Sequence, residues 1–220
     1  MALYVDSARP EEVREALGWG FVAGVTTNPH LIAQAGRPAE EVIPELCALC
    51  PGPVFYQPAA AEPRSLEEEG RRFAAISPSQ IVLKIPASLE NLAVLARLSP
   101  EIPCAATAVF SAAQAYLAAE AGARYIIPYV NRMTRYSGRG IALVEEIAAV
   151  LRGSGRRAEI LAASLREVSE ALACLAAGAH HLTLPPALIR AMAEHPLSQQ
   201  AIADFARLAG RNPGTSPGGS

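Results

Sequence analysis

A complete strand–helix–strand pattern occupies residues 81–109, IVLKIPASLENLAVLARLSPEIPCAATAV. Ile81–Ile85 and Cys104–Val109 are short apolar runs typical of buried strands, whereas Leu89–Leu98 repeats apolar residues three and four apart. Ser88 precedes that helical pattern as a suitable N-cap. Because strand–helix–strand units cross over right-handedly, this pattern predicts two parallel strands covered by a helix.

The same alternation extends in both directions along the chain. The other strand candidates are short apolar runs: Leu3–Asp6, Gly24–Thr27, Val54–Gln57, Tyr125–Val130, Ile160–Ser164 and His181–Leu184. Helical patterns separate them, among them Leu66–Ile76, Ser111–Ala121, Ile141–Leu151 and Val168–Ala177. Eight such units in 220 residues predict a (β/α)8 TIM barrel, an α/β fold. An open doubly wound sheet is the alternative, but it calls for a glycine-rich turn where the sequence reads Ser7-Ala8-Arg9-Pro10.

The chain is expected to form one domain over residues 1–209. That domain includes an extra C-terminal helix at Ser198–Leu208, which could cap the barrel or dock on a neighbouring subunit. Residues 210–220 are rich in glycine, proline and serine, and they are predicted to form a flexible tail.

Composition excludes several classes of protein. With 51% hydrophobic and 18% charged residues the chain can bury a sizeable core, and its net charge of −2 argues against nucleic-acid binding. No apolar run reaches the roughly 18 residues of a membrane span, and no signal peptide is expected at the start. Four cysteines in a chain of this size indicate free thiols in a reducing compartment, so we expect a cytoplasmic protein. The CxxC spacing of Cys47 and Cys50 has no second pair beside it and predicts no zinc site.

Lys84 is the only lysine among the 19 basic residues, so it escapes a strong bias towards arginine. It shares one face of its strand with Val82, whereas Ile81, Leu83 and Ile85 form the greasier face expected to meet the helices. Lys84 is therefore predicted to point into the barrel near the C-terminal rim, where TIM-barrel active sites lie. A lysine amine in low-polarity surroundings can form a Schiff base with a carbonyl compound, which arginine cannot do. A buried lysine paired with an acid is the alternative interpretation.

Asp6, Thr26 and Asn28 are polar residues at the ends of the first two strands. A carboxylate at position 6 could shuttle protons while a carbinolamine forms and dehydrates, although it could equally cap the following helix. Thr26 and Asn28 share a face and could bind substrate hydroxyls, or they could serve only turn and cap chemistry.

Other strands also end in polar residues, so that polar tips on seven strands predict one ring of functional groups. Its further members are Gln57, Thr107, Tyr129 and Ser164. Arg132 and Arg166 follow two of these strands, where an arginine fork can hold a phosphate.

At these residues the chain resembles the transaldolase family, in particular its short branch similar to fructose-6-phosphate aldolase. The likeness covers about residues 3–206. The segments that carry it are Leu3-Tyr4-Val5-Asp6, Ala23-Gly24-Val25-Thr26-Thr27-Asn28-Pro29, Val82-Leu83-Lys84-Ile85-Pro86, Thr107-Ala108-Val109-Phe110-Ser111-Ala112-Ala113-Gln114, Ala121-Gly122-Ala123, Pro128-Tyr129-Val130-Asn131-Arg132 and Ala162-Ala163-Ser164.

The resemblance implies a class I aldolase that uses no metal or other cofactor and acts on small sugar phosphates. Lys84 would be the Schiff-base lysine, Asp6 the proton shuttle and Asn28 a ligand of the donor hydroxyls. Gln57, Thr107 and Tyr129 would hold a catalytic water or act as the acid and base. Arg132, Ser164 and Arg166 would bind the sugar's phosphate. The aldolase branch forms homo-oligomers of the pentamer or decamer type, often through the C-terminal helix.

Three departures from classical transaldolases favour the aldolase branch. Positions that would be Glu, Asn and Phe in those enzymes read Gln57, Ala105 and Tyr129 here. We therefore expect reversible cleavage of a ketose such as fructose 6-phosphate into dihydroxyacetone and glyceraldehyde 3-phosphate. Transfer of a dihydroxyacetone unit between sugar phosphates, as in the pentose phosphate pathway, is the alternative. A barrel that binds a sugar phosphate without turnover is a third possibility. His30 and Ser7 also deviate from the family pattern and leave the preferred substrate open.

Overall fold

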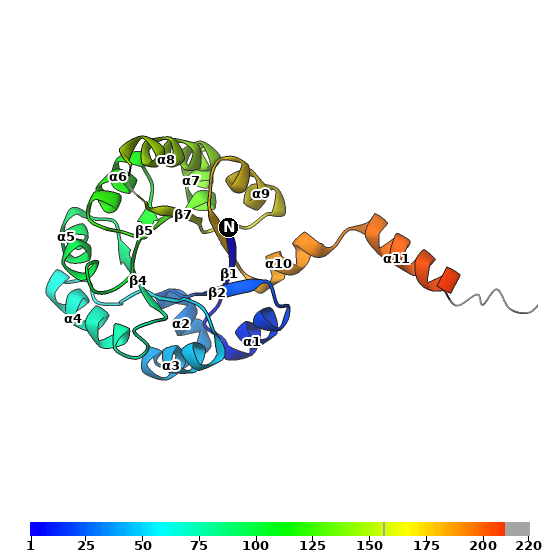
Figure 1. The fold of residues 1–220 in the computed structure, drawn as a ribbon, viewed down its shortest axis with the longest axis horizontal. Helices are drawn as coiled ribbons and strands as arrows, with labels where there is room; N and C mark the ends of the chain where they lie inside the picture. Colours follow the sequence, from blue (N-terminus) through cyan, green and yellow to red (C-terminus); the bar gives the residue numbers. More distant parts are fainter. Residues whose placement is uncertain (156, 210–220) are drawn as a thin grey trace, which may run out of the picture.

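The computed structural model describes residues 1–155 and 157–209 and shows a closed barrel of parallel strands in the order β1 to β8. Helices surround this barrel in a ring (Figure 1). The predicted (β/α)8 fold is therefore confirmed. The strands are β1 Ala2–Asp6, β2 Val22–Thr26, β3 Val54–Tyr56, β4 Ile81–Pro86, β5 Cys104–Val109, β6 Tyr125–Pro128, β7 Glu159–Ala162 and β8 His181–Leu184.

The helices of the described residues lie close to the predicted patterns. Ser88 and Ser111 cap their helices as serines should, with their hydroxyls accepting from Asn91 N and Gln114 N. The predicted strand 125–130 is shorter in the structure, because Tyr129 is already the N-cap of the next helix. The helices are α1 Pro10–Gly18, α2 Pro29–Ala35, α3 Ala39–Leu49, α4 Pro63–Ala74, α5 Leu89–Leu98, α6 Ala112–Glu120, α7 Val130–Ser137, α8 Gly140–Ser154, α9 Val168–Ala176, α10 Pro186–Ala193 and α11 Pro196–Ala209.

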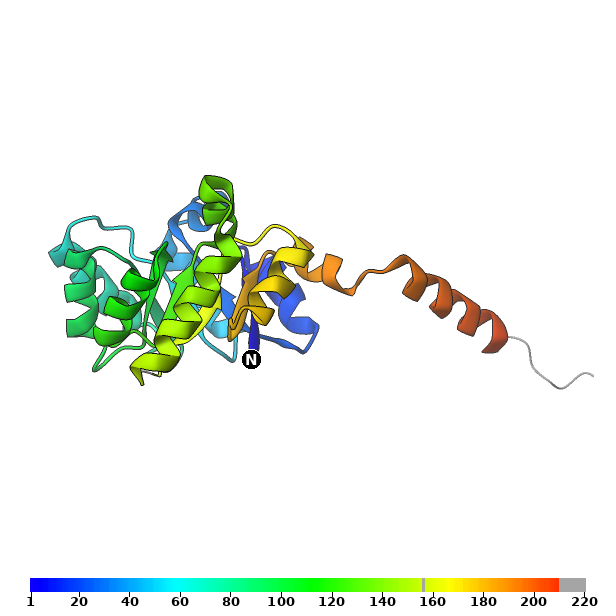
Figure 2. The same ribbon diagram turned by 90° about the horizontal axis from the view of Figure 1, so that it is seen from above.

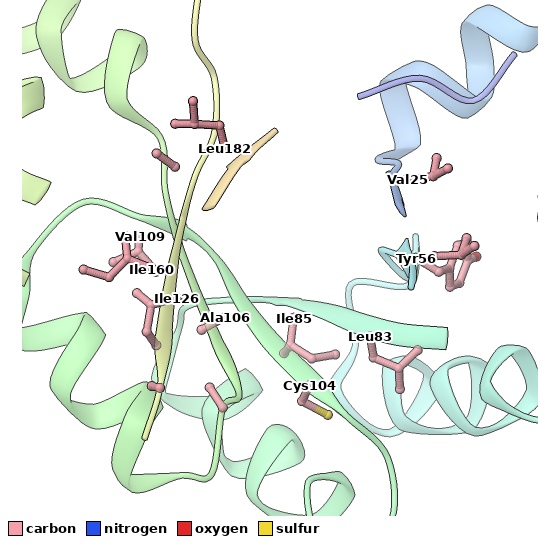
Figure 3. Packing of buried hydrophobic residues seen from close by; sticks show 14 of the residues in the cluster. Val25, Tyr56, Leu83, Ile85, Cys104, Ala106, Val109, Ile126, Ile160 and Leu182 are labelled. Carbon is pink, nitrogen blue, oxygen red and sulfur yellow. The ribbon is translucent and has the colours of Figure 1, made fainter. Parts of the chain in front are cut away.

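Alternate residues of each strand build two separate hydrophobic layers. Outward-facing residues such as Leu83, Ile85 and Ile126 pack under the helices (Figure 3). Inward-facing residues such as Val82 and Phe55 fill the lower part of the barrel. The alternation in β4 therefore places Lys84 inside the barrel, on the same side as Val82, as the sequence predicted.

An aromatic floor, formed by Tyr4, Phe55, Tyr125 and His181, closes the N-terminal end of the barrel. Their rings meet edge to face, with centroids 5.2 Å apart for Tyr4 and Phe55 and 5.8 Å apart for Tyr4 and His181. Gly24 makes room for this packing, because a Cβ there would lie 3.0 Å from the ring of Tyr4. The floor leaves the C-terminal end as the accessible end of the barrel.

His181 in this floor should make the stability of the protein depend on pH. Burial lowers the pKa of His181 from its ordinary 6.5, although Glu159, with Oε2 3.3 Å from Nε2, pulls it upward. As the pH falls through about 6.5, the unfolded chain takes up its proton first, so the free energy of unfolding should decrease. Urea unfolding at several values between about pH 5 and pH 8 measures this.

The replacement His181→Phe should flatten that pH dependence, because it keeps a ring in the floor and removes the titrating group. His195→Gln is the matched control, since His195 is exposed beyond α10 and should leave the curve unchanged. An unchanged slope in His181→Phe would refute the assignment.

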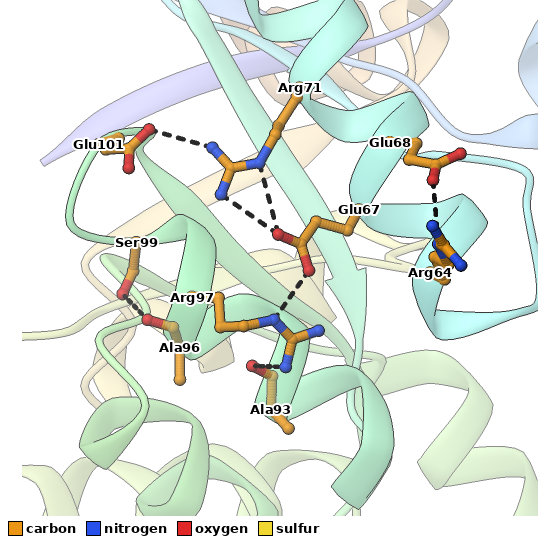
Figure 4. A network of polar contacts seen from close by, with 9 residues as sticks. All are labelled: Arg64, Glu67, Glu68, Arg71, Ala93, Ala96, Arg97, Ser99 and Glu101. Atoms are coloured by element: carbon orange, nitrogen blue, oxygen red, sulfur yellow. Dashed lines mark hydrogen bonds and ion pairs between the residues drawn. The ribbon is translucent and has the colours of Figure 1, made fainter.

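A surface network joins α4 to α5 on the outside of the ring (Figure 4). The Glu67 carboxylate forms ion pairs with Arg97, at an N–O distance of 2.8 Å, and with Arg71, at 3.2 Å. Arg71 forms a second ion pair with Glu101 at 3.0 Å. These pairs are largely exposed, so each contributes at most about 1 kcal/mol. The network holds two neighbouring helices together but lies far from the inward face of the strands.

The C-terminal helix α11 extends away from the barrel (Figures 1 and 2), and none of its residues is buried. Its large apolar side chains are exposed: Leu197, Ile202, Phe205 and Leu208. The predicted flexible tail at residues 210–220 lies outside the described residues. None of the helices in the described part of the chain is long and apolar enough to cross a bilayer.

All four cysteines carry free thiols, as predicted. Cys50, Cys104 and Cys174 are buried, and Cys47 is partly buried. Burial raises the pKa of Cys47 to about 11 and that of Cys104 to about 12. Both thiols therefore stay protonated and weakly reactive near neutral pH.

Candidate active site at the mouth of the barrel

A hollow of about 500 Å³ opens at the C-terminal ends of the strands, and it is called the mouth hollow here. Its volume suits a small organic ligand. Predicted site residues from six strands or the loops after them line it: Asp6, Asn28, Gln57, Lys84, Tyr129, Arg132 and Ser164. The structure therefore brings together residues that lie up to 158 positions apart in the sequence.

Lys84 lies inside the barrel near the end of β4, with 3% of its surface exposed. Its Nζ donates a hydrogen bond of 2.7 Å to the carbonyl oxygen of Thr27. Thr27 is itself fixed, because its hydroxyl donates to the carbonyl of Phe55 at 2.8 Å. The lysine amine is therefore held at the bottom of the mouth hollow by the rigid backbone that directly follows β2.

Asp6 ends β1 beside Lys84 and accepts a 2.6 Å hydrogen bond from Thr26 Oγ1. Burial raises the pKa of Asp6 above its ordinary value, and the charge on Lys84 and the Thr26 hydroxyl lower it in part. A carboxyl with a raised pKa can hold or release a proton closer to neutral pH. Asp6 does not cap α1: Ser7 Oγ accepts from Arg9 N instead and donates to Glu12.

Thr26 and Asn28, predicted to share a face, occupy different depths. Thr26 is fully buried beneath the mouth hollow, and its hydroxyl contacts Asp6 and Thr183. Asn28 lines the hollow, and its Oδ1 also accepts from Leu31 N as the N-cap of α2. Asn28 therefore both caps α2 and lines the mouth hollow.

Tyr129 and Gln57 also line the mouth hollow, whereas Thr107 is not among the residues that line it. The hydroxyl of Thr107 donates to the Tyr129 hydroxyl at 3.4 Å, and Thr107 itself is fully buried. Gln57 Oε1 is buried and has no hydrogen-bond partner among the described residues. A buried acceptor of this kind is suited to a bound water or substrate hydroxyl.

Two arginines stand at the rim, as predicted, but they line different hollows. Arg132 lines the mouth hollow, and its guanidinium lies 5.0 Å from the ring centre of Tyr129. Arg166 lines an adjoining hollow of about 640 Å³, which also contains Ser164 and Asp6. Ser164 lines both hollows, so a ligand bound there could contact either arginine.

Two residues at the rim have a left-handed backbone, which is unusual for residues other than glycine. They are Ala108, with φ +55°, and Ser164, with φ +57°. Ala108 interrupts the pairing of β5 with β6 between Thr107 and Val109. Such irregularities re-aim the neighbouring side chains and occur often beside active sites.

Sequence reasoning missed two residues. Thr183 on β8 is buried and lines the mouth hollow, which completes the polar ring with its eighth strand. The signal was present, since Thr183 alternates with Leu182 and Leu184 in an apolar run. Glu69 lies in a run of charged residues typical of a solvated helix face, but it accepts from Tyr56 Oη at 2.6 Å and from the backbone of Ala59 and Ala60 at 3.0 Å. It thereby fixes the loop that follows Gln57.

A comparison with known protein families identifies the family of this chain. The family model described as transaldolase/fructose-6-phosphate aldolase matches residues 3–212. The chain belongs to this family. The resemblance inferred from the sequence is thus confirmed over nearly the whole chain. Among the residues described, no group of three or more His, Cys, Asp or Glu is placed to hold a metal ion.

Relatives of similar length carry related names. The chain is 39% identical over 206 residues to a probable transaldolase of Caulobacter sp. (strain K31), covering 93% of this chain and 94% of the relative. It is 40% identical over 206 residues to a probable transaldolase of Hyphomonas neptunium, covering 93% and 95%. Membership of the transaldolase/fructose-6-phosphate aldolase family makes the chain an enzyme of the aldolase or transaldolase type, which works through a Schiff base.

Solved structures support the barrel fold at low identity. A crystal structure of mandelate oxidase with (S)-2-phenylpropionate aligns with a TM-score of 0.62 and 17% identity. The alignment covers 84% of this chain and 64% of that chain. At this identity the likeness concerns the fold alone.

Proposed function

We propose that the enzyme is a class I aldolase that forms and cleaves fructose 6-phosphate, using dihydroxyacetone as donor and glyceraldehyde 3-phosphate as acceptor. The arrangement of Lys84, Asp6 and Tyr129 around one hollow carries this proposal. Lys84 supplies the nucleophile, and Asp6 and Tyr129 supply acid and base groups that line the same hollow.

The chemistry needs only side chains of this chain and water. The amine of Lys84 attacks the carbonyl carbon of dihydroxyacetone, and the carbinolamine loses water to give a protonated Schiff base. Loss of a proton from the neighbouring carbon gives an enamine, whose carbon attacks the aldehyde carbon of glyceraldehyde 3-phosphate. Water then hydrolyses the new Schiff base, which releases the ketose and restores the amine.

The proton transfers in these reaction steps need side chains that can accept a proton and return it. Asp6, with its raised pKa, is assigned to proton transfer during carbinolamine formation and dehydration. The Tyr129 hydroxyl, which is hydrogen-bonded to Thr107, is assigned to proton transfer to and from the substrate. Gln57 is assigned to holding a water molecule. Asn28 is assigned to the donor hydroxyls, and Arg132, Ser164 and Arg166 to the phosphate.

Tyr129 favours direct aldol chemistry over transfer. A phenol can act as acid or base where the phenylalanine of classical transaldolases cannot. Gln57 and Ala105 depart from those enzymes in the same direction. Transfer of a dihydroxyacetone unit from fructose 6-phosphate to erythrose 4-phosphate is the alternative function, favoured by the names of the relatives.

Two assays on the purified protein separate these functions. Synthesis of fructose 6-phosphate from dihydroxyacetone and glyceraldehyde 3-phosphate should be faster than transfer to erythrose 4-phosphate. In Tyr129→Phe the synthesis rate should fall by about 10²-fold and the transfer rate by less. Tyr136→Phe is the matched control, because that hydroxyl is on α7 but the residue is 87% exposed. Faster transfer than synthesis in the unaltered enzyme would reject the aldolase assignment.

The apolar face of α11 is proposed to join copies of the chain into a homo-oligomer. Ile202, Phe205 and Leu208 recur at helical spacing and are exposed, which is costly for an isolated subunit. Light scattering should give a multiple of the 23.1 kDa subunit mass, and Phe205→Glu should lower it. A mass of one subunit for the unaltered chain would contradict the assembly.

A further inference from the structure

We propose that Thr183 is a positioning residue that acts on Asp6 through Thr26, by a directed chain of hydrogen bonds across β8, β2 and β1. The inference extends the proposed function, since it rests on Asp6 as the proton shuttle for its catalytic consequence. It assigns a role to the one strand tip of the barrel that sequence reasoning left empty.

With Asp6 ionised, the number of available protons decides the direction of these hydrogen bonds. Thr26 Oγ1 lies 2.6 Å from Asp6 Oδ1 and 2.5 Å from Thr183 Oγ1. A threonine hydroxyl has one proton to donate, and an ionised carboxylate can only accept. Thr26 therefore donates to Asp6, and Thr183 must donate to Thr26.

The register of the barrel explains why residues 157 positions apart meet. In a barrel of this type, alternate strands contribute the four side chains of one interior layer. Following the strand pairing around the barrel places Thr26, Lys84, Ile127 and Thr183 in one such layer. Asp6 stands one layer higher on β1, between β8 and β2. The two threonines thus support Asp6 from below and from both neighbouring strands.

The hydrogen bonds from Thr183 to Thr26 and from Thr26 to Asp6 stabilise the ionised form of Asp6 more than its protonated form. A protonated carboxyl could donate to Thr26 and reverse the chain, but hydrogen bonds to a charged acceptor are the stronger ones. Donation by Thr183 polarises the Thr26 hydroxyl and strengthens its bond to the carboxylate. Thr183 and Thr26 are both buried, so water cannot replace either partner easily.

Charged and titratable groups around Asp6 stay constant when the threonines are replaced. In the mouth hollow these groups are His30, Lys84, Tyr129 and Arg132. In the hollows that adjoin it, they are Arg9, Glu12, Glu15, Arg166 and Arg190. A shift in the titration of Asp6 upon replacing Thr183 is therefore attributable to the lost hydroxyl.

The sequence offers a clean way to observe Asp6, because Asp204 is its only other aspartate. Cell-free synthesis with aspartate carrying ¹³C in its side-chain carboxyl gives two signals, and Asp6→Asn identifies the Asp6 signal. Asp204 on α11 is the internal control. The titration is read on the protein without substrate, so it is independent of which reaction the enzyme catalyses.

Thr183→Val should raise the pKa of Asp6 by a few tenths of a unit, and Thr183→Ser should restore it. Thr26→Val should raise it by about 1–2 units, because the direct donor is lost. Thr183→Val should add nothing in the Thr26→Val background, since Thr183 acts only through Thr26. In the enzyme, the limb of the pH–rate profile that Asp6→Asn abolishes should move to higher pH by the same amount.

Two results would overturn the proposal. One is an Asp6 titration unmoved in Thr183→Val, and the other is a further shift in the double variant, which would mean that Thr183 acts directly. Thr183→Ala provides a second removal of the hydroxyl without added bulk, and it should reproduce the Thr183→Val shift. A cooperative thermal transition shows that each variant is folded, and an unchanged titration of Asp204 shows that the shift is confined to Asp6.

Discussion

Reduction with borohydride in the presence of dihydroxyacetone is expected to attach one reduced donor to Lys84. The amine lies inside the mouth hollow, where a Schiff base can form and be trapped. Because the sequence holds a single lysine, an adduct on the internal peptide that contains residue 84 identifies the site without ambiguity. Intact mass and peptide mapping measure it.

Lys84→Met and Lys84→Arg should both abolish the adduct and lower turnover by about 10⁴-fold or more. Methionine keeps an unbranched side chain one atom shorter and has no amine, and arginine keeps the positive charge but stays protonated. Arg14→Met, which removes an exposed cation from α1, should retain full activity. An active preparation whose mass is unchanged by borohydride and substrate would defeat the Schiff-base mechanism. A protein that only binds sugar phosphates would show no turnover to lose.

Asp6→Asn is expected to lower the turnover number by about 10²–10⁴-fold, the usual contribution of a general acid–base group. The asparagine Oδ1 can still accept from Thr26, so this hydrogen bond is kept while the group that carries the proton is lost. Removal of the carboxylate also leaves the buried Lys84 without its neighbouring charge.

The measurement separates binding from chemistry. Rapid-quench trapping should show slow formation of the Lys84 adduct in Asp6→Asn, with a smaller change in KM than in kcat. Glu11→Gln is the control, since it removes an exposed carboxylate from α1 close in sequence. Full turnover by Asp6→Asn would exclude Asp6 as the proton shuttle.

The sequence was sufficient for the barrel and for the placement of Lys84 inside it. Strand–helix alternation predicted eight parallel strands, and the two-residue period of β4 placed Lys84 inside because its other face was more apolar. The bounds of Leu89–Leu98, Cys104–Val109 and His181–Leu184 coincide with the structure. Local pattern was enough in these cases because burial on one face decides them.

Contacts between distant strands could not be predicted from local pattern. The meeting of Thr26 with Thr183 depends on how far the strands shift around the closed barrel, which no short segment encodes. Tyr129 was assigned to a strand because its neighbours are apolar, yet the helix α7 begins directly after it. Glu69 belongs by period to a charged helix surface, but its carboxylate meets Tyr56 and a loop backbone instead.

The aromatic floor closes one end of the barrel, so the interior is open only at the other end. Solvent and any ligand of the mouth hollow must pass over the same rim, because the rings of Tyr4, Phe55 and Tyr125 fill the opposite end. Engineering for heat resistance can therefore be concentrated below these rings, and redesign of ligand specificity above them. Residues that determine stability and residues that determine ligand specificity thus lie at opposite ends of the barrel axis.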